Sequence, residues 1–289
     1  MIGRAACRGA ATIVNAIATG KGAAFGISLE VDAAVELENG AGDVALAGSA
    51  EGADLVAGCV KAVAARAGVT GGVRGEVHIS SEIPISRGLK SSSAVSNAVS
   101  LATSRALGAT LPDMDLILAG IEESMKAGVT ITGAFDDASA CYLGGVVVTD
   151  NRNFMILHKG NMDPDLDIVV HVPEKRITKK SLKGLDFSPI KKDVEHAFDL
   201  AMRGEYLKAM EVNSRAYARV LDVSEDIAQL ARKKGALAAG ISGTGPATVA
   251  VCNRTEMGDV LQALQKEEGT VLKAKVNDVS AREVVPRLL

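Results

Sequence analysis

Residues 25–37, which read FGISLEVDAAVEL, limit the possible folds of this chain more than any other segment. Apolar side chains occupy every odd position from Phe25 to Leu37, and the even positions hold glycine, serine, alanine or an acidic residue. Successive side chains of a strand point to opposite faces, so the segment predicts a strand with one buried and one wet face. Strands buried on both faces of a parallel sheet rarely alternate in this way, so an antiparallel or mixed sheet is expected.

Helical and extended patterns follow one another without a regular strand–helix–strand order, which predicts an α+β fold. With 289 residues the chain exceeds one ordinary core, so two domains are expected, 1–150 and 151–289. Helices are expected at about 53–66, 92–107, 113–127, 190–203, 206–221, 225–234 and 257–267. Besides 25–37, strands are expected near 73–83, within 144–151 after a turn, and near 153–160, 166–173, 248–252 and 270–276.

Charge and composition exclude several classes of protein. The net charge of −3 argues against nucleic acid as the main partner. Residues 235–253 carry no charge, but they contain four glycines and Pro246, so they predict strand–turn–strand rather than a membrane helix. The four isolated cysteines fit a reducing compartment, and the N-terminus does not resemble a signal peptide. We therefore expect a cytoplasmic protein without a membrane partner, either a monomer or a homodimer.

The segment 84–99, PISRGLKSSSAVSNAV, places a glycine, a lysine and three serines where a helix is expected to begin. A helix start has free N–H groups and the positive end of the dipole, which together attract anions. A serine that only caps the helix is the alternative. Capping explains one hydroxyl, whereas phosphate binding explains all three serines together with Gly88 and Lys90.

Two further segments could contribute ligand-binding or catalytic residues. Residues 240–247, GISGTGPA, form either a glycine-rich turn close to a ligand or an ordinary turn between strands. Residues 132–145, TGAFDDASACYLGG, hold adjacent carboxylates at Asp136 and Asp137. One of them could accept the proton of an attacking hydroxyl, or both could simply be acids that favour a helix N-terminus.

Taken in order, these segments resemble the GHMP kinases, which include galactokinase, homoserine kinase and mevalonate kinase. PISRGLKSSSA is similar to that family's Pro-x-x-x-Gly-Leu-x-Ser-Ser motif, and GISGTGPA to its glycine-rich third motif. In the family's catalytic segment, two glycines follow the aspartate after seven and eight residues, a spacing that Asp137 meets. NAIATGKGAAFGI falls where the family has a substrate-side loop. Within the family, the segments most resemble archaeal-type shikimate kinases, with Lys90 where glycine is usual.

The resemblance implies a two-domain GHMP-kinase-like fold, with helices packed on mixed or antiparallel sheets and MgATP in the cleft between the domains. The expected reaction is the ATP-dependent phosphorylation of shikimate. Homoserine kinase, or another small-alcohol kinase of the family, is the alternative enzyme, and a non-catalytic nucleotide-binding protein is the alternative of another class. The residues expected to bind ATP are Pro84, Arg87, Gly88, Leu89, Lys90, Ser91, Ser92, Ser93, Ala94, Gly243, Thr244 and Gly245.

The resemblance also implies roles in catalysis. Asp137 would take or orient the proton of the substrate hydroxyl, and Lys21 would pair with it. Ser92, or Ser91, would contact Mg²⁺ together with Glu123, for which Glu122 is the alternative. The residues expected to line the substrate site are Asn15, Lys21, Thr132 and Asp137.

Overall fold

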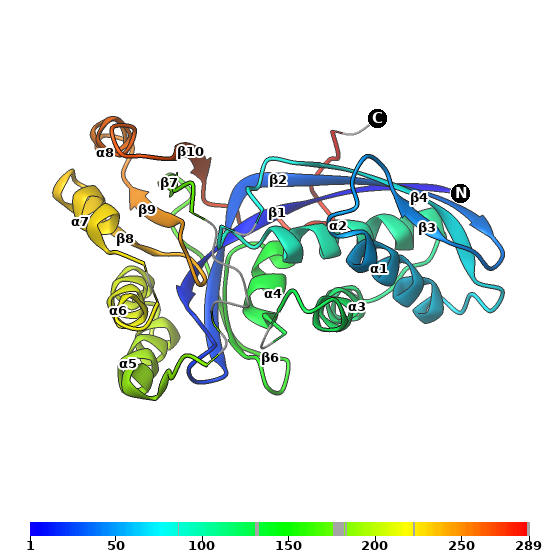
Figure 1. The fold of residues 1–289 in the computed structure, drawn as a ribbon, viewed down its shortest axis with the longest axis horizontal. Coiled ribbons are helices and arrows are strands. Elements are labelled where there is room, and N and C mark those ends of the chain that lie inside the picture. The colour runs from blue at the N-terminus through cyan, green and yellow to red at the C-terminus, as the bar shows by residue number, and fades with distance from the viewer. Residues whose placement is uncertain (86, 131–132, 176–181, 183, 222, 288–289) are drawn as a thin grey trace.

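The computed structural model describes residues 1–85, 87–130, 133–175, 182, 184–221 and 223–287. Two sheets and the helices packed on them make up the described part, as expected for an α+β chain (Figure 1). The first sheet has the strand order β3-β4-β2-β5-β6, with β1 also paired to β2. Its pairings are antiparallel except β3–β4. The strands are β1 (Ile2–Val14), β2 (Lys21–Asn39), β3 (Val44–Leu46), β4 (Val73–Ser81), β5 (Val146–Asp150) and β6 (Met155–Gly160).

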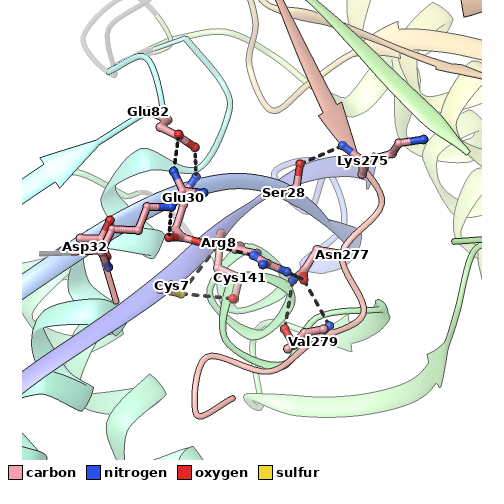
Figure 2. Close-up of polar contacts among 11 residues, drawn as sticks. Cys7, Arg8, Ser28, Glu30, Asp32, Glu82, Cys141, Lys275, Asn277 and Val279 are labelled. Atoms are coloured by element: carbon pink, nitrogen blue, oxygen red, sulfur yellow. Dashed lines mark hydrogen bonds and ion pairs between the residues drawn. The ribbon is translucent and has the colours of Figure 1, made fainter. Parts of the chain in front are cut away.

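The segment 25–37 lies inside β2, but the prediction of a wet face is wrong. From Gly22 to Val35 only Ser28 escapes full burial, and even Glu30 and Asp32 are buried. Residues 275–287 run back over this part of the first sheet, as the contacts of Lys275 with Ser28 and of Asn277 with Arg8 in Figure 2 show. The alternation therefore marks two different buried faces, one apolar and one with paired charges.

The buried carboxylates of β2 are compensated by this C-terminal segment and by β1. Arg8 donates to Glu30 at 3.4 Å and to Asn277 at 2.6 Å. Arg287 Nε lies 3.2 Å from Glu30, and the Arg287 backbone N–H donates to Asp32 at 2.7 Å. Burial of a charge is tolerated where such partners replace water.

Helices cover the other face of the first sheet (Figure 1). The central one, α2, is built mainly from alanine, serine and valine and is almost entirely buried. A Cβ on Gly3 of β1 would lie 2.0 Å from the Ala102 carbonyl oxygen, so glycine and small helix residues allow a very close approach. These helices are α1 (Ala53–Arg66), α2 (Ser91–Ala106), α3 (Asp113–Lys126) and α4 (Phe135–Leu143).

The second sheet is antiparallel, with the order β10-β7-β9-β8. Helices α7 and α8 share a small apolar cluster with one of its faces, and α6 packs against β8. The elements are β7 (Asp167–Val172), β8 (Ala238–Ile241), β9 (Thr248–Cys252), β10 (Thr270–Lys275), α5 (Lys191–Met202), α6 (Tyr206–Ala218), α7 (Asp226–Lys233), α8 (Met257–Leu264) and the short 3₁₀ helix η2 (Ser188–Ile190).

The expected boundary near residue 150 falls between β5 and β6, which pair with each other in the first sheet. The division into domains 1–150 and 151–289 stays a prediction. No helix in the described part of the chain combines the length and apolar character that a membrane crossing needs.

Candidate active site

The loop between β4 and α2 brings the lysine and the serines of the 84–99 segment to a helix start. Lys90 is the N-cap of α2 in a left-handed conformation with φ 64°, and its side chain makes no capping bond. Gly88 has φ 88°, and a Cβ there would lie 2.1 Å from the Ser242 carbonyl oxygen. The backbone N–H groups of the first turn, residues 91–93, are therefore left for an external acceptor.

Helix α4 carries the two adjacent carboxylates in its first turn. Asp137 Oδ1 lies 2.9 Å from Lys90 Nζ, and both side chains are largely buried. This ion pair connects the N-terminal turn of α4 to that of α2. The carboxylate that the sequence singles out therefore lies directly beside the anion-attracting loop.

Asp136 has a different environment from Asp137. Its side chain is 4% exposed, and Asn151 Nδ2 donates to its Oδ1 at 2.7 Å. Thr149 in turn donates to Asn151 Oδ1 at 2.7 Å. Burial, and then the charge of Asp137, raise the pKa of Asp136 to about 7, against the opposing effects of Lys90 and Asn151. The carboxyl of Asp136 thus holds a proton at mildly acidic pH.

The glycine-rich turn between β8 and β9 meets the same loop. Ser242 Oγ donates to the Gly88 carbonyl at 2.8 Å, and the Gly243 N–H donates to Thr12 Oγ1 at 2.7 Å. A Cβ on Gly243 would lie 3.1 Å from Lys90 Nζ. Gly243 has φ 61°, which also favours glycine.

These elements line one cleft of about 730 Å³ with a polar and an apolar part. The polar part contains the residues expected to bind ATP, with the exception of Ala94, together with Asn15, Asp136 and Asp137. The apolar part lies between α1, α2, β3 and β4 and includes Leu46, Leu55, Val56, Ile79 and Val95. Ala94 is fully buried and does not line the cleft.

Lys21 does not pair with Asp137, contrary to the expectation. Its ammonium lies 5.2 Å from the centre of the Phe198 ring on α5. The cation beside Asp137 is instead Lys90. The difference arises because Lys90 protrudes from the cap of α2 toward α4, a relationship that sequence spacing does not reveal.

Glu123 and Glu122 do not line the cleft, contrary to the expected metal site with Ser92. Both line a separate surface pocket between α1 and α3, where Glu123 pairs with Lys126 at 2.5 Å and Glu122 with Arg66 at 2.7 Å. The residue of α3 beside Glu123 that faces the cleft is Ser124. One residue along a helix is a rotation of about 100°, which is enough to move a side chain to another face.

Three further residues of the expected site are Arg87, Thr132 and Asn15. Arg87 lines the cleft, but its guanidinium donates to the carbonyls of Pro173 and Lys175. Thr132 lies outside the described residues. Asn15 lines the cleft as expected, although its side chain is engaged with Gly243 O at 2.8 Å and with the Ile17 N–H at 3.0 Å.

Sequence reasoning missed several residues that shape the site. Asn151 and Thr149 stand at the end of β5 in a segment that predicts only a strand and a turn, so no local signal reveals them. Thr12 Oγ1 accepts a hydrogen bond from the Gly243 N–H, which is distant from it in the sequence. Lys90 did carry a signal, because lysine replaces the usual glycine of the motif that the segment resembles.

A loop with Gly88 and Lys90 at a helix start, a glycine-rich turn and a carboxylate line one cleft, an arrangement that fits a small-molecule kinase better than a purely structural domain. The family model for the GHMP kinases N terminal domain matches residues 54–145, and that for the GHMP kinases C terminal matches residues 191–270. The chain belongs to the GHMP kinase family.

Two curated relatives are named shikimate kinase. The protein of Methanothrix thermoacetophila is 40% identical over 284 residues, which cover 98% of this chain and 96% of the relative. That of Thermococcus kodakarensis is 41% identical over 256 residues, covering 88% and 93%. The crystal structure of a homoserine kinase from Cytophaga hutchinsonii matches 96% of each chain with a TM-score of 0.76 at 18% identity, which shows a shared fold.

Proposed function

We propose that this protein transfers the terminal phosphoryl group of ATP to a hydroxyl group of shikimate. The observation that carries the proposal is the 2.9 Å ion pair between Lys90 of the loop and Asp137 of α4. It brings an anion-attracting helix start and a carboxylate into one cleft. The relatives named shikimate kinase, about 40% identical over nearly the whole chain, support the choice of substrate.

The loop 87–93 binds the triphosphate in this proposal. Backbone N–H groups at the start of α2, the hydroxyls of Ser91, Ser92 and Ser93, and the Lys90 ammonium all offer positive potential to phosphate oxygens. The glycine-rich turn at Gly243 lies against the same loop. Phosphoryl transfer depends mainly on such positioning and charge neutralisation.

The apolar part of the cleft is the place for the adenine base. A flat, weakly polar ring gains most from burial against aliphatic side chains such as Leu55, Val56 and Val95, which line this part. It adjoins the loop, so a nucleotide can extend from the apolar part to the phosphate groups at α2.

Asp137 is the residue that orients the acceptor hydroxyl and takes its proton. Its carboxylate is beside the loop that holds the terminal phosphate, so a hydroxyl bonded to it can approach the phosphorus atom. The Lys90 ammonium, paired with Asp137, would also reach a phosphate bound at the loop and stabilise the negative charge that develops on the transferred group. Asp136, with its raised pKa, lies one residue away.

Magnesium fits this arrangement without a dedicated protein cage. Among the described residues no group of three or more histidine, cysteine, aspartate or glutamate side chains could hold a metal ion. Mg²⁺ commonly takes one or two protein oxygens and several from phosphates and water. Ser92 lines the cleft and would supply a protein oxygen, and the ion would neutralise phosphate charge. We place the enzyme in the cytoplasm, in keeping with four buried free cysteines.

The test is ADP release by the purified protein with MgATP and one acceptor at a time: shikimate, homoserine, mevalonate or galactose. We expect turnover with shikimate alone and a phosphorylated product that mass spectrometry detects. Turnover with homoserine and none with shikimate would replace the substrate by the alternative. ATP binding without a phosphorylated product from any acceptor would favour the non-catalytic alternative.

A further inference from the structure

The turn between β1 and β2, residues 15–20, forms part of the cleft wall next to the carboxylates. Asn15 and Ile17 line the cleft together with Asp136 and Asp137. The strand β2 begins directly after the turn, and a Cβ on Gly22 would lie 2.4 Å from Asp136 Oδ2. A shift of this turn would therefore change the space beside the carboxylates, where an acceptor must bind.

Helix α6, from the second half of the chain, holds this turn through two buried side chains. Asn213 Oδ1 accepts the Asn15 N–H at 2.9 Å. The Tyr217 hydroxyl donates to the Asn15 carbonyl at 2.8 Å and accepts the Ala18 N–H at 3.0 Å. Figure 1 shows the β1–β2 turn reaching down beside α5 and α6. Three backbone groups of the turn thus depend on α6 for their hydrogen bonds.

Neither α6 residue is among those that line the cleft. Both are 1% exposed, and the Tyr217 ring packs at 5.9 Å from the Phe187 ring, centre to centre. Burial raises the pKa of Tyr217, so its hydroxyl stays protonated and keeps both bonds to the turn. Asn213 Oδ1 and the Tyr217 hydroxyl are bonded to the backbone of the turn.

The Asn15 side chain links the 15–20 turn to the glycine-rich turn at Gly243, beside the loop proposed to bind phosphate. Its Nδ2 donates to the Gly243 carbonyl at 2.8 Å, and Gly243 lies against Gly88 and Lys90. The glycine-rich turn also has its own supports in Thr12 and Ser242. Loss of the α6 contacts therefore frees the 15–20 turn while the phosphate loop keeps its other bonds.

We propose that Tyr217 and Asn213 are positioning residues that set the affinity for the acceptor alcohol by holding the 15–20 turn, without touching either substrate. The inference rests on the proposed kinase function. It predicts that the α6 contacts change the KM for the acceptor and not the KM for ATP. A residue that only stabilises the fold would change both KM values.

The test compares Tyr217→Phe with Tyr206→Phe. Tyr206 is on the same helix, but its hydroxyl lies 3.1 Å from His158 Nε2, away from the turn. Tyr217→Phe leaves one C=O and one N–H of the turn without their partner, so we expect the acceptor KM to rise about 10-fold. The KM for ATP is expected to stay within about twofold, and Tyr206→Phe to change neither value.

Two more measurements keep the proposal falsifiable. Asn213→Ala removes one bond to the same turn, so its effect on the acceptor KM and that of Tyr217→Phe should combine to less than their product in a double-mutant cycle. Hydrogen–deuterium exchange should rise in the peptide 14–22 of Tyr217→Phe and stay unchanged in α4.

An equal rise of both KM values, no rise of either, or unchanged exchange in peptide 14–22 would each overturn the proposal. A wild-type protein that phosphorylates none of the acceptors would contradict the proposed function, and the exchange experiment alone would then decide whether α6 holds the turn.

Discussion

Lys90 Nζ and Asp137 Oδ1 lie 2.9 Å apart, and the two residues stand at the starts of α2 and α4. Both helices begin after a non-glycine residue in a left-handed conformation, Lys90 with φ 64° and Ala134 with φ 48°. Such conformations are costly outside glycine and are concentrated at functional sites. The pair therefore joins two strained helix starts across the cleft, and the first two predictions concern it.

Asp137→Asn should lower kcat by about 100-fold or more while ATP still binds, because asparagine cannot take the hydroxyl proton. Steady-state kinetics and calorimetric titration with ATP measure the two effects. Asp199→Asn, an exposed acid on α5, is the matched control and should leave both unchanged. Wild-type turnover in Asp137→Asn would exclude Asp137 as the proton acceptor.

Lys90→Gly should lower kcat/KM for ATP by about 10- to 100-fold, because the ammonium beside the phosphates is lost. The unfolding midpoint should change little, since glycine relieves the left-handed backbone at this cap and offsets part of the lost ion pair. Lys90→Ala loses the charge without this relief and should unfold at a lower temperature than Lys90→Gly. Equal midpoints for the two variants would contradict the strain argument.

Asp136 should make folding stability depend on pH. Its pKa is about 7 in the folded state, against an ordinary value of 3.8. Between these values the folded state binds more protons, so this group's contribution makes stability fall as pH rises from about 4 to 7, by on the order of a few kcal/mol. Asp136→Asn removes that contribution.

Urea unfolding of the wild type and of Asp136→Asn at several pH values between 4.5 and 7.5 measures the contribution of Asp136 to the pH dependence of stability. The difference in unfolding free energy between Asp136→Asn and wild type should grow in favour of the variant as pH increases. A constant difference across the range would show that Asp136 is not a buried carboxyl that retains its proton.

Arg8→Met should destabilise the fold by about 1–3 kcal/mol, less than for a fully buried pair because Arg8 is itself partly exposed. The change removes one of the two cations that pair with the buried Glu30 carboxylate among the described residues, leaving Arg287, and it removes the bond to Asn277 (Figure 2). Arg74→Met is the control on the same sheet, since its pair with Glu38 is exposed on both sides and should contribute under about 1 kcal/mol. Chemical denaturation measures the free energy of unfolding of both variants. An equal decrease in Arg8→Met and Arg74→Met would contradict the argument that Glu30 is a buried charge that needs Arg8.

Local physics explains why parts of the candidate site could be anticipated from the sequence. The loop 84–90 needed Gly88 for a positive φ, and serines after Lys90 begin a helix whose free N–H groups follow from the hydrogen-bonding pattern. The adjacent acids were interpreted either as a proton acceptor or as acids at a helix N-terminus, and they lie in the first turn of α4, a helix that was not predicted. The Gly144–Gly145 pair served in the sequence only as a spacing marker. A Cβ on Gly144 would lie 2.7 Å from Asp278, so glycine lets the C-terminal segment pass close to the end of α4.

The sequence by itself determined the α+β class, the long strand over 25–37, the helix start at the serines and the likeness to a kinase family. These depend on neighbours within a few residues or on motifs in order along the chain. Only the tertiary structure decided that Lys90 and not Lys21 pairs with Asp137, that Glu123 faces away from the cleft, and that Glu30 is buried. Each of those depends on a partner or a covering segment distant in sequence, or on which way a helix face turns. Burial and charge pairing are properties of the packed chain and leave no local signal in its sequence.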